Sequence, residues 1–120
     1  MKQLEHTEQV TLMQWWHLVC KGMGVPEELL FAIPNGGQRN IIVASKLKAE
    51  GVRAGVPDLF LAYPTRRHCG LFIEMKKPKG GRASDKQKSM LATLAENGYA
   101  TAICHGWTDA RTTIEEYLES

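Results

Sequence analysis

The chain has 120 residues, of which 43% are hydrophobic and 23% are charged, and its formal net charge is +2. This composition is typical of one globular domain over residues 1–120 and excludes collagen-like or intrinsically disordered chains. No apolar run approaches the roughly 18 residues of a membrane-spanning helix. Residues 1–10 carry Lys2, Glu5 and Glu8 in place of the apolar core of a secretory signal.

Cysteine and histidine spacing argues against a disulfide framework and against a zinc finger. Cys20, Cys69 and Cys104 lie far apart and form no CxxC pair, which favours a reducing compartment such as the cytoplasm. No metal-ligand spacing is present among the four histidines, His6, His17, His68 and His105.

The first predicted element is a helix over residues 5–21, ended by the glycines that follow it. Its apolar stripe consists of Leu12, Trp15, Trp16 and Val19. Glu8 lies one turn before Leu12, on or beside this stripe, which is an unusual position for a carboxylate.

Three strands are predicted next, over residues 29–33, 58–63 and 70–76, with a short helix over residues 41–49 between the first two. The turn Pro34-Asn35-Gly36-Gly37 closes the first strand. We expect the second and third strands to pair as a hairpin.

The C-terminal part is predicted to contain a helix, a strand and a final helix. Ser84 and Gln87 have the spacing of a capping box, and Asn97-Gly98 ends the helix that they begin. A strand over residues 99–104 and a helix capped by Thr108 complete the chain. The order predicts an α/β fold, with a mixed sheet of four strands flanked by helices.

Polar residues interrupt the apolar pattern of the strands. Because side chains alternate along a strand, Glu74 and Lys76 share the face opposite Ile73 and Met75. Asp58 opens the strand expected to lie beside them. Two close carboxylates repel each other and are costly to desolvate, and a divalent cation relieves both costs. Oxygen ligands favour Mg²⁺ or Mn²⁺ over Zn²⁺.

A plainer interpretation is that Asp58 is a turn residue and that Glu74 and Lys76 form a surface ion pair on an edge strand. The motifs Pro57-Asp58 and Glu74-Met75-Lys76 nevertheless resemble those of the PD-(D/E)XK nuclease superfamily, whose core has the restriction-endonuclease-like fold. More narrowly, the chain resembles the VRR-NUC (virus-type replication-repair nuclease) family. The stretches that carry this resemblance are Pro34–Gly37, Gly51–Asp58, Glu74–Pro78, Ser84–Gln87 and Gly98-Tyr99.

The resemblance implies a metal site formed by Asp58, Glu74 and the Met75 backbone carbonyl, with Mg²⁺ or Mn²⁺ as the cofactor. Glu8 would complete this site directly or through water, although an ordinary exposed helix position is the alternative and Glu5 is a weaker substitute. The Asn35-Gly36-Gly37 segment is either a plain turn or a main-chain contact to a phosphate near the site.

The resemblance also implies roles for two further side chains. Lys76 would orient the attacking water or stabilise the charged phosphate. Gln87 would hold water or substrate, unless it is only a capping-box residue.

Lysine and arginine residues flank these motifs, as expected for a groove that binds a phosphate backbone. Those predicted to contact DNA are Lys46, Arg53, Lys77, Lys79, Arg82 and Lys88.

The sequence therefore indicates a metal-dependent DNA endonuclease. The family resemblance suggests branched DNA as substrate, such as four-way (Holliday) junctions or flaps in replication and repair. It also suggests a homodimer, built on apolar residues of the first or last helix, in the cytoplasm of a bacterium or phage-infected cell. The alternatives are a non-catalytic module that binds structured DNA and a sequence-specific restriction-type endonuclease.

Overall fold

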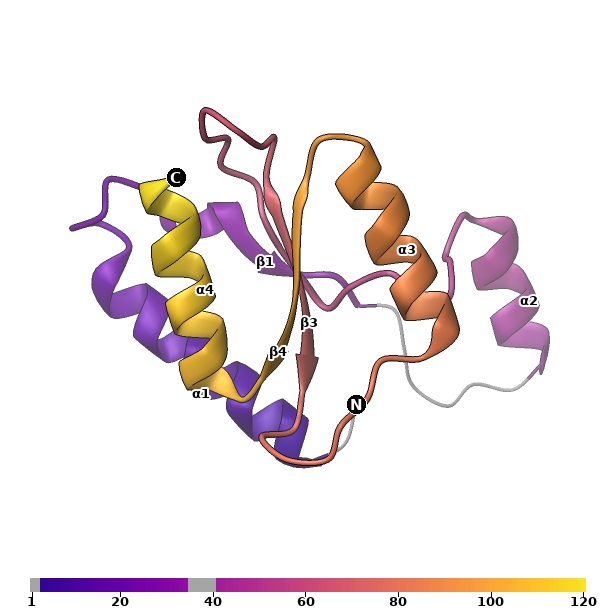
Figure 1. Cartoon of the computed structure of the whole chain (residues 1–120). Coiled ribbons are helices and arrows are strands. Elements are labelled where there is room, and N and C mark those ends of the chain that lie inside the picture. Colours follow the sequence, from indigo (N-terminus) through magenta and orange to yellow (C-terminus); the bar gives the residue numbers. More distant parts are fainter. Residues whose placement is uncertain (1–2, 35–40) are drawn as a thin grey trace.

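The computed structural model describes residues 3–34 and 41–120, in which a four-stranded sheet separates two layers of helices (Figure 1). The strand order is β1-β2-β3-β4, and β1–β2 and β2–β3 are antiparallel whereas β3–β4 is parallel. The mixed sheet and the expected hairpin are therefore confirmed. The strands are β1 (Leu30–Ala32), β2 (Leu59–Leu61), β3 (Leu71–Lys76) and β4 (Ala100–His105).

Helices lie on both sides of the sheet. α1 (Gln3–Val19) and α4 (Trp107–Glu119) pack together over one face, and α3 (Asp85–Glu96) covers the other (Figure 1). α2 (Ile41–Ala49) lies beyond α3, and a short 3-10 helix, η1 (Glu27–Leu29), precedes β1. Within the described residues, no helix combines the length and the apolar character needed to cross a membrane.

The main core lies between the sheet and the α1–α4 layer. Ile73 and Met75 of β3 are fully buried against Trp16 of α1 and Ile114 of α4. Each such side chain contributes roughly 1.5–3 kcal/mol when it leaves water. The predicted alternation along β3 is confirmed, since these residues point into the core while Glu74 and Lys76 point to the opposite face.

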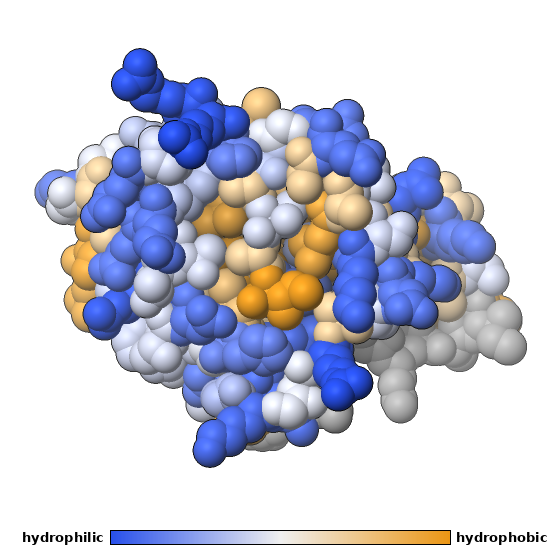
Figure 2. Space-filling view, in the orientation of Figure 1, coloured by the Kyte–Doolittle hydropathy of each residue, from blue (hydrophilic) through white to orange (hydrophobic). Residues whose placement is uncertain are grey.

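A second apolar cluster occupies that opposite face. The rings of Phe60 and Phe72 stack with centroids 4.2 Å apart, and Tyr99 meets Phe72 edge-on at 5.2 Å. Figure 2 shows apolar surface at the centre of the molecule, over the edge strand β4, with hydrophilic residues around it. The aromatic cluster fills the part of this face toward the start of β3 and leaves the end of the strand to polar side chains.

The C-terminal ends of β3 and β4 and the N-termini of α3 and α4 lie at one edge of the sheet (Figure 1). This follows from the β3–α3–β4 crossover, because a helix that links two parallel strands must return along the sheet before the next strand begins. Polar residues at these termini are thereby brought together, although they are distant in sequence.

Most predicted elements are confirmed, with their ends shifted. α1 covers residues 3–19 rather than 5–21, because Cys20–Gly24 forms the turn, and β2 is shorter than expected, so Asp58 precedes the strand. The predicted helix over residues 41–49 has the observed bounds. The Asn35-Gly36-Gly37 prediction lies outside the described residues.

The predicted cap of the last helix is wrong. Thr108 lies inside α4, whose N-cap is Gly106 with a φ of 89°. The N–H of Trp107 instead donates to Glu8 Oε1 at 2.8 Å. A Cβ at position 106 would lie 2.9 Å from that oxygen, so a glycine is required for Glu8 to reach the helix end. A carboxylate at a helix N-terminus is also favoured by the helix dipole.

Gly55 sets the distance between the loop before Asp58 and the start of α3. Its φ is +88°, and a Cβ there would lie 2.6 Å from the Lys86 carbonyl oxygen and 3.2 Å from the Gln87 nitrogen. Sequence reasoning assigned Gly55 no role in the site beyond its place before Pro57-Asp58.

We expect Gly55→Ala to destabilise the protein more than Gly24→Ala. Gly24 has a similar φ of +77° but open space around it, so its substitution costs only the left-handed strain of roughly 1–2 kcal/mol. The close approach at Gly55 adds about 1–3 kcal/mol for displaced backbone. Urea unfolding measures both, and equal losses would contradict this account of Gly55.

Candidate active site

Asp58 and Glu74 lie side by side at the end of β3. The last register pair between β2 and β3 is Leu59 with Ile73. Beyond that pair, Asp58 Oδ2 accepts the N–H of Met75 at 2.8 Å. The Asp58 side chain thus replaces the main chain of β2 as the partner of Met75, which fixes its carboxylate beside that of Glu74.

Glu74 is 3% exposed and is held by two donors at one oxygen. Its Oε2 accepts from Gln87 Nε2 at 3.0 Å and lies 3.3 Å from Lys76 Nζ. Its other oxygen, Oε1, is buried, and no donor from the described residues reaches it. A buried oxygen left in this state is costly, since it loses its hydration without compensation.

The surroundings of Glu74 raise its pKa from 4.5 to about 8. Burial is the largest cause, followed by the negative charge of Asp58 and by a hydrogen bond with Asp58, which favours the protonated form. Lys76 acts in the opposite direction but does not outweigh these effects. The two carboxylates would repel each other if both were ionised. A proton shared between them, or a bound cation, removes this repulsion.

Gln87 is both a capping residue and a site residue. Its Oε1 accepts the N–H of Ser84 at 2.8 Å, and its own N–H donates to Ser84 Oγ at 3.2 Å, so the predicted capping box is confirmed. Since the cap holds the amide oxygen, the amide nitrogen faces Glu74. The helix start therefore orients the donor that reaches the buried carboxylate.

The arrangement is incompatible with the alternative in which Asp58 is only a turn residue and Glu74 and Lys76 form a surface ion pair. β3 lies between β2 and β4, so Glu74 and Lys76 do not lie on an edge strand. Asp58 contacts β3 and is not a free turn residue. The structure brings Asp58, Glu74, Lys76 and Gln87 together as expected.

Glu8 is not brought into this group. Its carboxylate caps α4, and among the described residues no three His, Cys, Asp or Glu side chains lie close enough to hold a metal ion. A cation at Asp58 and Glu74 would therefore need a main-chain oxygen or water as well. The unpartnered Glu74 Oε1 and the two adjacent carboxylates fit a hard divalent cation.

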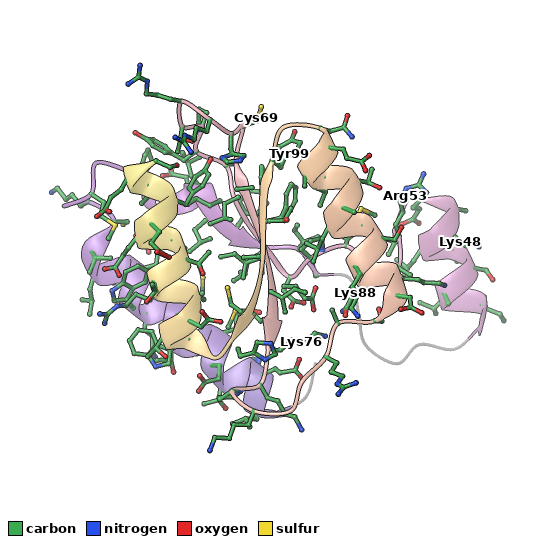
Figure 3. The ribbon with its side chains drawn as sticks, in the orientation of Figure 1. Lys48, Arg53, Cys69, Lys76, Lys88 and Tyr99 are labelled. Atoms are coloured by element: carbon green, nitrogen blue, oxygen red, sulfur yellow. The ribbon has the colours of Figure 1, made fainter. Side chains whose placement is uncertain are left out.

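The predicted DNA-contacting residues come from several elements: Lys46 from α2, Arg53 from the loop after it, Lys77, Lys79 and Arg82 from the segment after β3, and Lys88 from α3. Figure 3 labels Lys88 in the lower part of α3 and Arg53 beside α2. Lys77 is half-buried, and the remaining predicted contacts, Lys46, Lys79 and Arg82, are exposed, as are Arg53 and Lys88.

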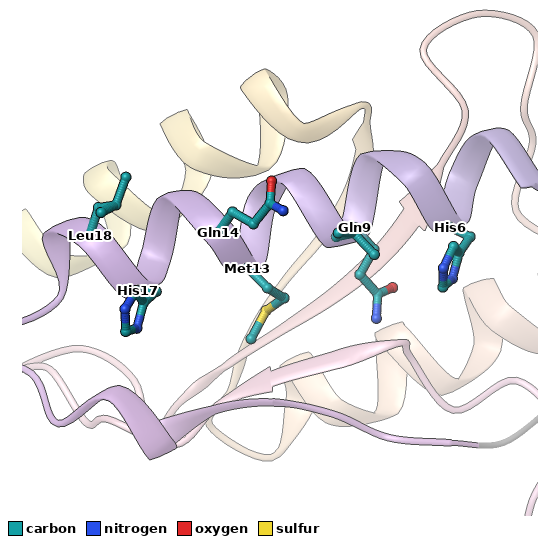
Figure 4. Close-up of a pocket in the computed structure, with 7 residues that line it drawn as sticks. His6, Gln9, Met13, Gln14, His17 and Leu18 are labelled. Atoms are coloured by element: carbon teal, nitrogen blue, oxygen red, sulfur yellow. The ribbon is translucent and has the colours of Figure 1, made fainter.

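A groove of about 500 Å³ runs along α1, apart from the carboxylates (Figure 4). Its lining is predominantly apolar and includes Val10, Met13 and Leu18. Val10 and Leu18 are 41% and 79% exposed. The groove is therefore a surface feature of a different kind from the charged site.

Comparison with known proteins agrees with the resemblance in sequence. The model of the VRR-NUC domain matches residues 3–108. The chain belongs to the VRR-NUC family. A solved structure described as a "VRR_NUC domain protein" is 28% identical and superposes with a TM-score of 0.85, covering 99% of this chain and 91% of that one. No curated protein matches the chain.

Membership of the VRR-NUC family gives the chain a nuclease-type function. The matched region contains the four clustered residues, Asp58, Glu74, Lys76 and Gln87, together with Glu8.

We expect the metal-free VRR-NUC protein to lose stability as the pH rises from about 5 to 8. In that range the native state keeps a proton on Glu74 that the unfolded state has released, so raising the pH favours unfolding. Glu74→Gln should remove this part of the dependence. Each loss of 1 kcal/mol in the free energy of unfolding lowers the melting temperature by about 4 °C in a chain of this size.

Melting temperatures of both proteins in EDTA across this pH range provide the test. Because other groups also titrate, the quantity compared is the difference in melting temperature between wild type and variant at each pH. Parallel pH profiles would contradict the raised pKa of Glu74.

Proposed function

We propose that this protein is a metal-dependent endodeoxyribonuclease that hydrolyses phosphodiester bonds in branched DNA. The observation that carries the proposal is the buried Glu74 carboxylate, with one oxygen unpartnered, beside the carboxylate of Asp58. Such an arrangement is destabilising in the absence of a cation, and natural proteins retain such costs mainly at functional sites.

The residues that would hold Mg²⁺ or Mn²⁺ are Asp58, Glu74 and the Met75 carbonyl, with Glu8 acting through water. When bound, the cation supplies charge neutralisation and Lewis acidity toward a phosphate and water. Carboxylate and carbonyl oxygen donors favour these hard cations.

Lys76 and Gln87 have separate roles in this proposal. The Lys76 ammonium lies against Glu74 Oε2 and presents its positive charge at the end of the strand, where it stabilises a phosphate that becomes more negative during attack. The Gln87 amide keeps Glu74 oriented through its donated hydrogen bond. Both side chains are held before substrate arrives, so little reorganisation is needed.

DNA binding in this proposal depends mainly on phosphate contacts. The expected contacts are the six basic residues that flank the site, Lys46, Arg53, Lys77, Lys79, Arg82 and Lys88. Contacts of this kind are not specific to sequence and weaken as salt increases. The account therefore favours recognition of DNA shape over recognition of sequence.

A homodimer is part of the proposal, because a single small domain provides only one site whereas a junction presents two related strands. The groove along α1 and the exposed Val10 and Leu18 provide the apolar surface for a two-fold interface. The three free cysteines are consistent with action in a bacterial or phage-infected cytoplasm.

We expect Asp58→Asn and Glu74→Gln to abolish Mg²⁺-dependent cleavage while the circular dichroism spectrum is unchanged. Lys76→Met should lower the rate by about 10²–10³-fold, since it removes a charge at the reacting phosphate. Arg66→Met is the matched control, because Arg66 is exposed in the turn between β2 and β3, far from the end of β3. Labelled plasmid and synthetic junctions report the activity.

Other outcomes identify the alternatives. Wild-type protein that binds junctions but releases no product in Mg²⁺ or Mn²⁺ would indicate a non-catalytic module. Discrete cuts at one sequence of a linear duplex would indicate a restriction-type enzyme. Normal turnover by Asp58→Asn would exclude the metal site.

We expect the protein to be a dimer that cuts four-way junctions faster than linear duplex. Leu18→Glu places a charge in the proposed interface and should yield monomers with reduced junction preference. Ile42→Glu is the control, because Ile42 is 68% exposed but lies on α2. Light scattering and cleavage of matched substrates measure both properties, and a wild-type monomer without junction preference would contradict this part of the proposal.

A further inference from the structure

His105 lies beside Lys76 at the end of the sheet, although the two residues are 29 positions apart. β3 and β4 are parallel, and Lys76 is the register partner of His105, just as Glu74 is the partner of Ile103. Register partners on neighbouring strands point to the same face, with backbones about 4.8 Å apart. His105 therefore extends the row formed by Glu74 and Lys76.

Two hydrogen bonds hold His105 in place. Its backbone N–H donates to Asp109 Oδ2 at 2.8 Å, and its ring Nδ1 lies 3.3 Å from the carbonyl oxygen of Lys77. A carbonyl oxygen can only accept, so Nδ1 carries the proton of this bond. Nε2 is the nitrogen left for a ligand, on a side chain that is exposed to solvent.

The charges around His105 suit an anion. Lys76 is its neighbour on β3, and the loop that begins at Lys77 carries Lys79 and Arg82. Asp109 is hydrogen-bonded to the main chain of His105, and Glu8 is bonded to the main chain of Trp107. An anion at the end of β3 would thus meet Lys76 and Nε2 of His105 on neighbouring strands.

We propose that His105 contacts the DNA backbone through Nε2, at a phosphate adjacent to the one that is cut. The inference rests on the proposed nuclease function and adds a substrate-positioning residue that no sequence motif indicated. Because the Nδ1 proton is used in the bond to the Lys77 carbonyl, the contact of Nε2 with a phosphate oxygen requires the imidazolium ring, in which both nitrogens donate. His105 would then position the strand relative to Lys76 and the two carboxylates.

Two substitutions separate this role from a purely structural one. The amide of Asn can replace Nδ1 and keep the bond to the Lys77 carbonyl, but it has no group at the position of Nε2. The amide of Gln can place a donor near the position of Nε2. Arg66→Ala is the control, since Arg66 is exposed in the turn between β2 and β3, at the opposite end of β3 from Lys76.

Binding is measured by fluorescence anisotropy with a labelled junction in Ca²⁺, under conditions in which no product forms. We expect His105→Asn and His105→Ala to bind the junction about tenfold more weakly than wild type. This is the change expected when one charge-assisted hydrogen bond is lost. The log–log salt slope should fall by about one unit, the value for one lost phosphate contact. His105→Gln should recover part of the affinity.

An unchanged salt slope in His105→Asn would overturn the inference, as would recovery of affinity by Asn but not by Gln. Circular dichroism confirms that each variant is folded. Failure of the proposed function is distinguishable, because it shows as wild-type protein that makes no product in Mg²⁺ or Mn²⁺. The binding result remains interpretable in that case.

Discussion

A carboxyl group buried at the end of a β-sheet is the constraint around which the rest of this site is organised. Glu74 lies on an inner strand, where hydration is lost and the carboxylate of Asp58 is close by. Gln87 and Lys76 both reach the same Glu74 oxygen and leave the other without a partner. Among the described residues, hydrogen-bond donors therefore reach only one oxygen of this buried carboxyl.

The elements that support Glu74 are also elements that the chain needs for folding. The capping box begins α3 and orients the Gln87 amide, and the Asp58 side chain continues the β2–β3 ladder past its last register pair. Gly55 lets the loop before Asp58 approach the first turn of α3. Changes that weaken these local structures should therefore affect activity as well as stability, even where they touch no substrate.

Local patterns in the sequence predict most of the elements, and the family resemblance adds the four predicted site residues that the structure brings together. Alternation placed Glu74 and Lys76 on one face of β3, and the Ser84–Gln87 spacing located the start of α3, because both signals act over a few residues. Thr108 was wrongly expected to cap α4, since the actual partner of the helix end, Glu8, lies 99 residues away from Trp107. His105 was overlooked because its position beside Lys76 depends on the register of β4, which histidine spacing does not encode.

In the function that we propose, the acidic and the basic residues at this edge of the sheet have different roles. The carboxylates hold the cation, while Lys76, His105 and the basic loop that follows β3 hold the strand that is cut. The apolar groove on α1 is the surface that we propose for the dimer interface. Shape selection would then depend on the distance between two sites and not on base contacts.

The most direct test of the account is a calorimetric titration of the protein with Mn²⁺ at pH 7, in two buffers with different ionisation enthalpies. Because the pKa of Glu74 is raised to about 8, the carboxyl is mostly protonated before the cation binds. The account predicts saturable binding that releases a proton in wild type and is lost in Asp58→Asn and Glu74→Gln. Saturable binding that persists in both variants, or no binding to the wild type, would contradict it.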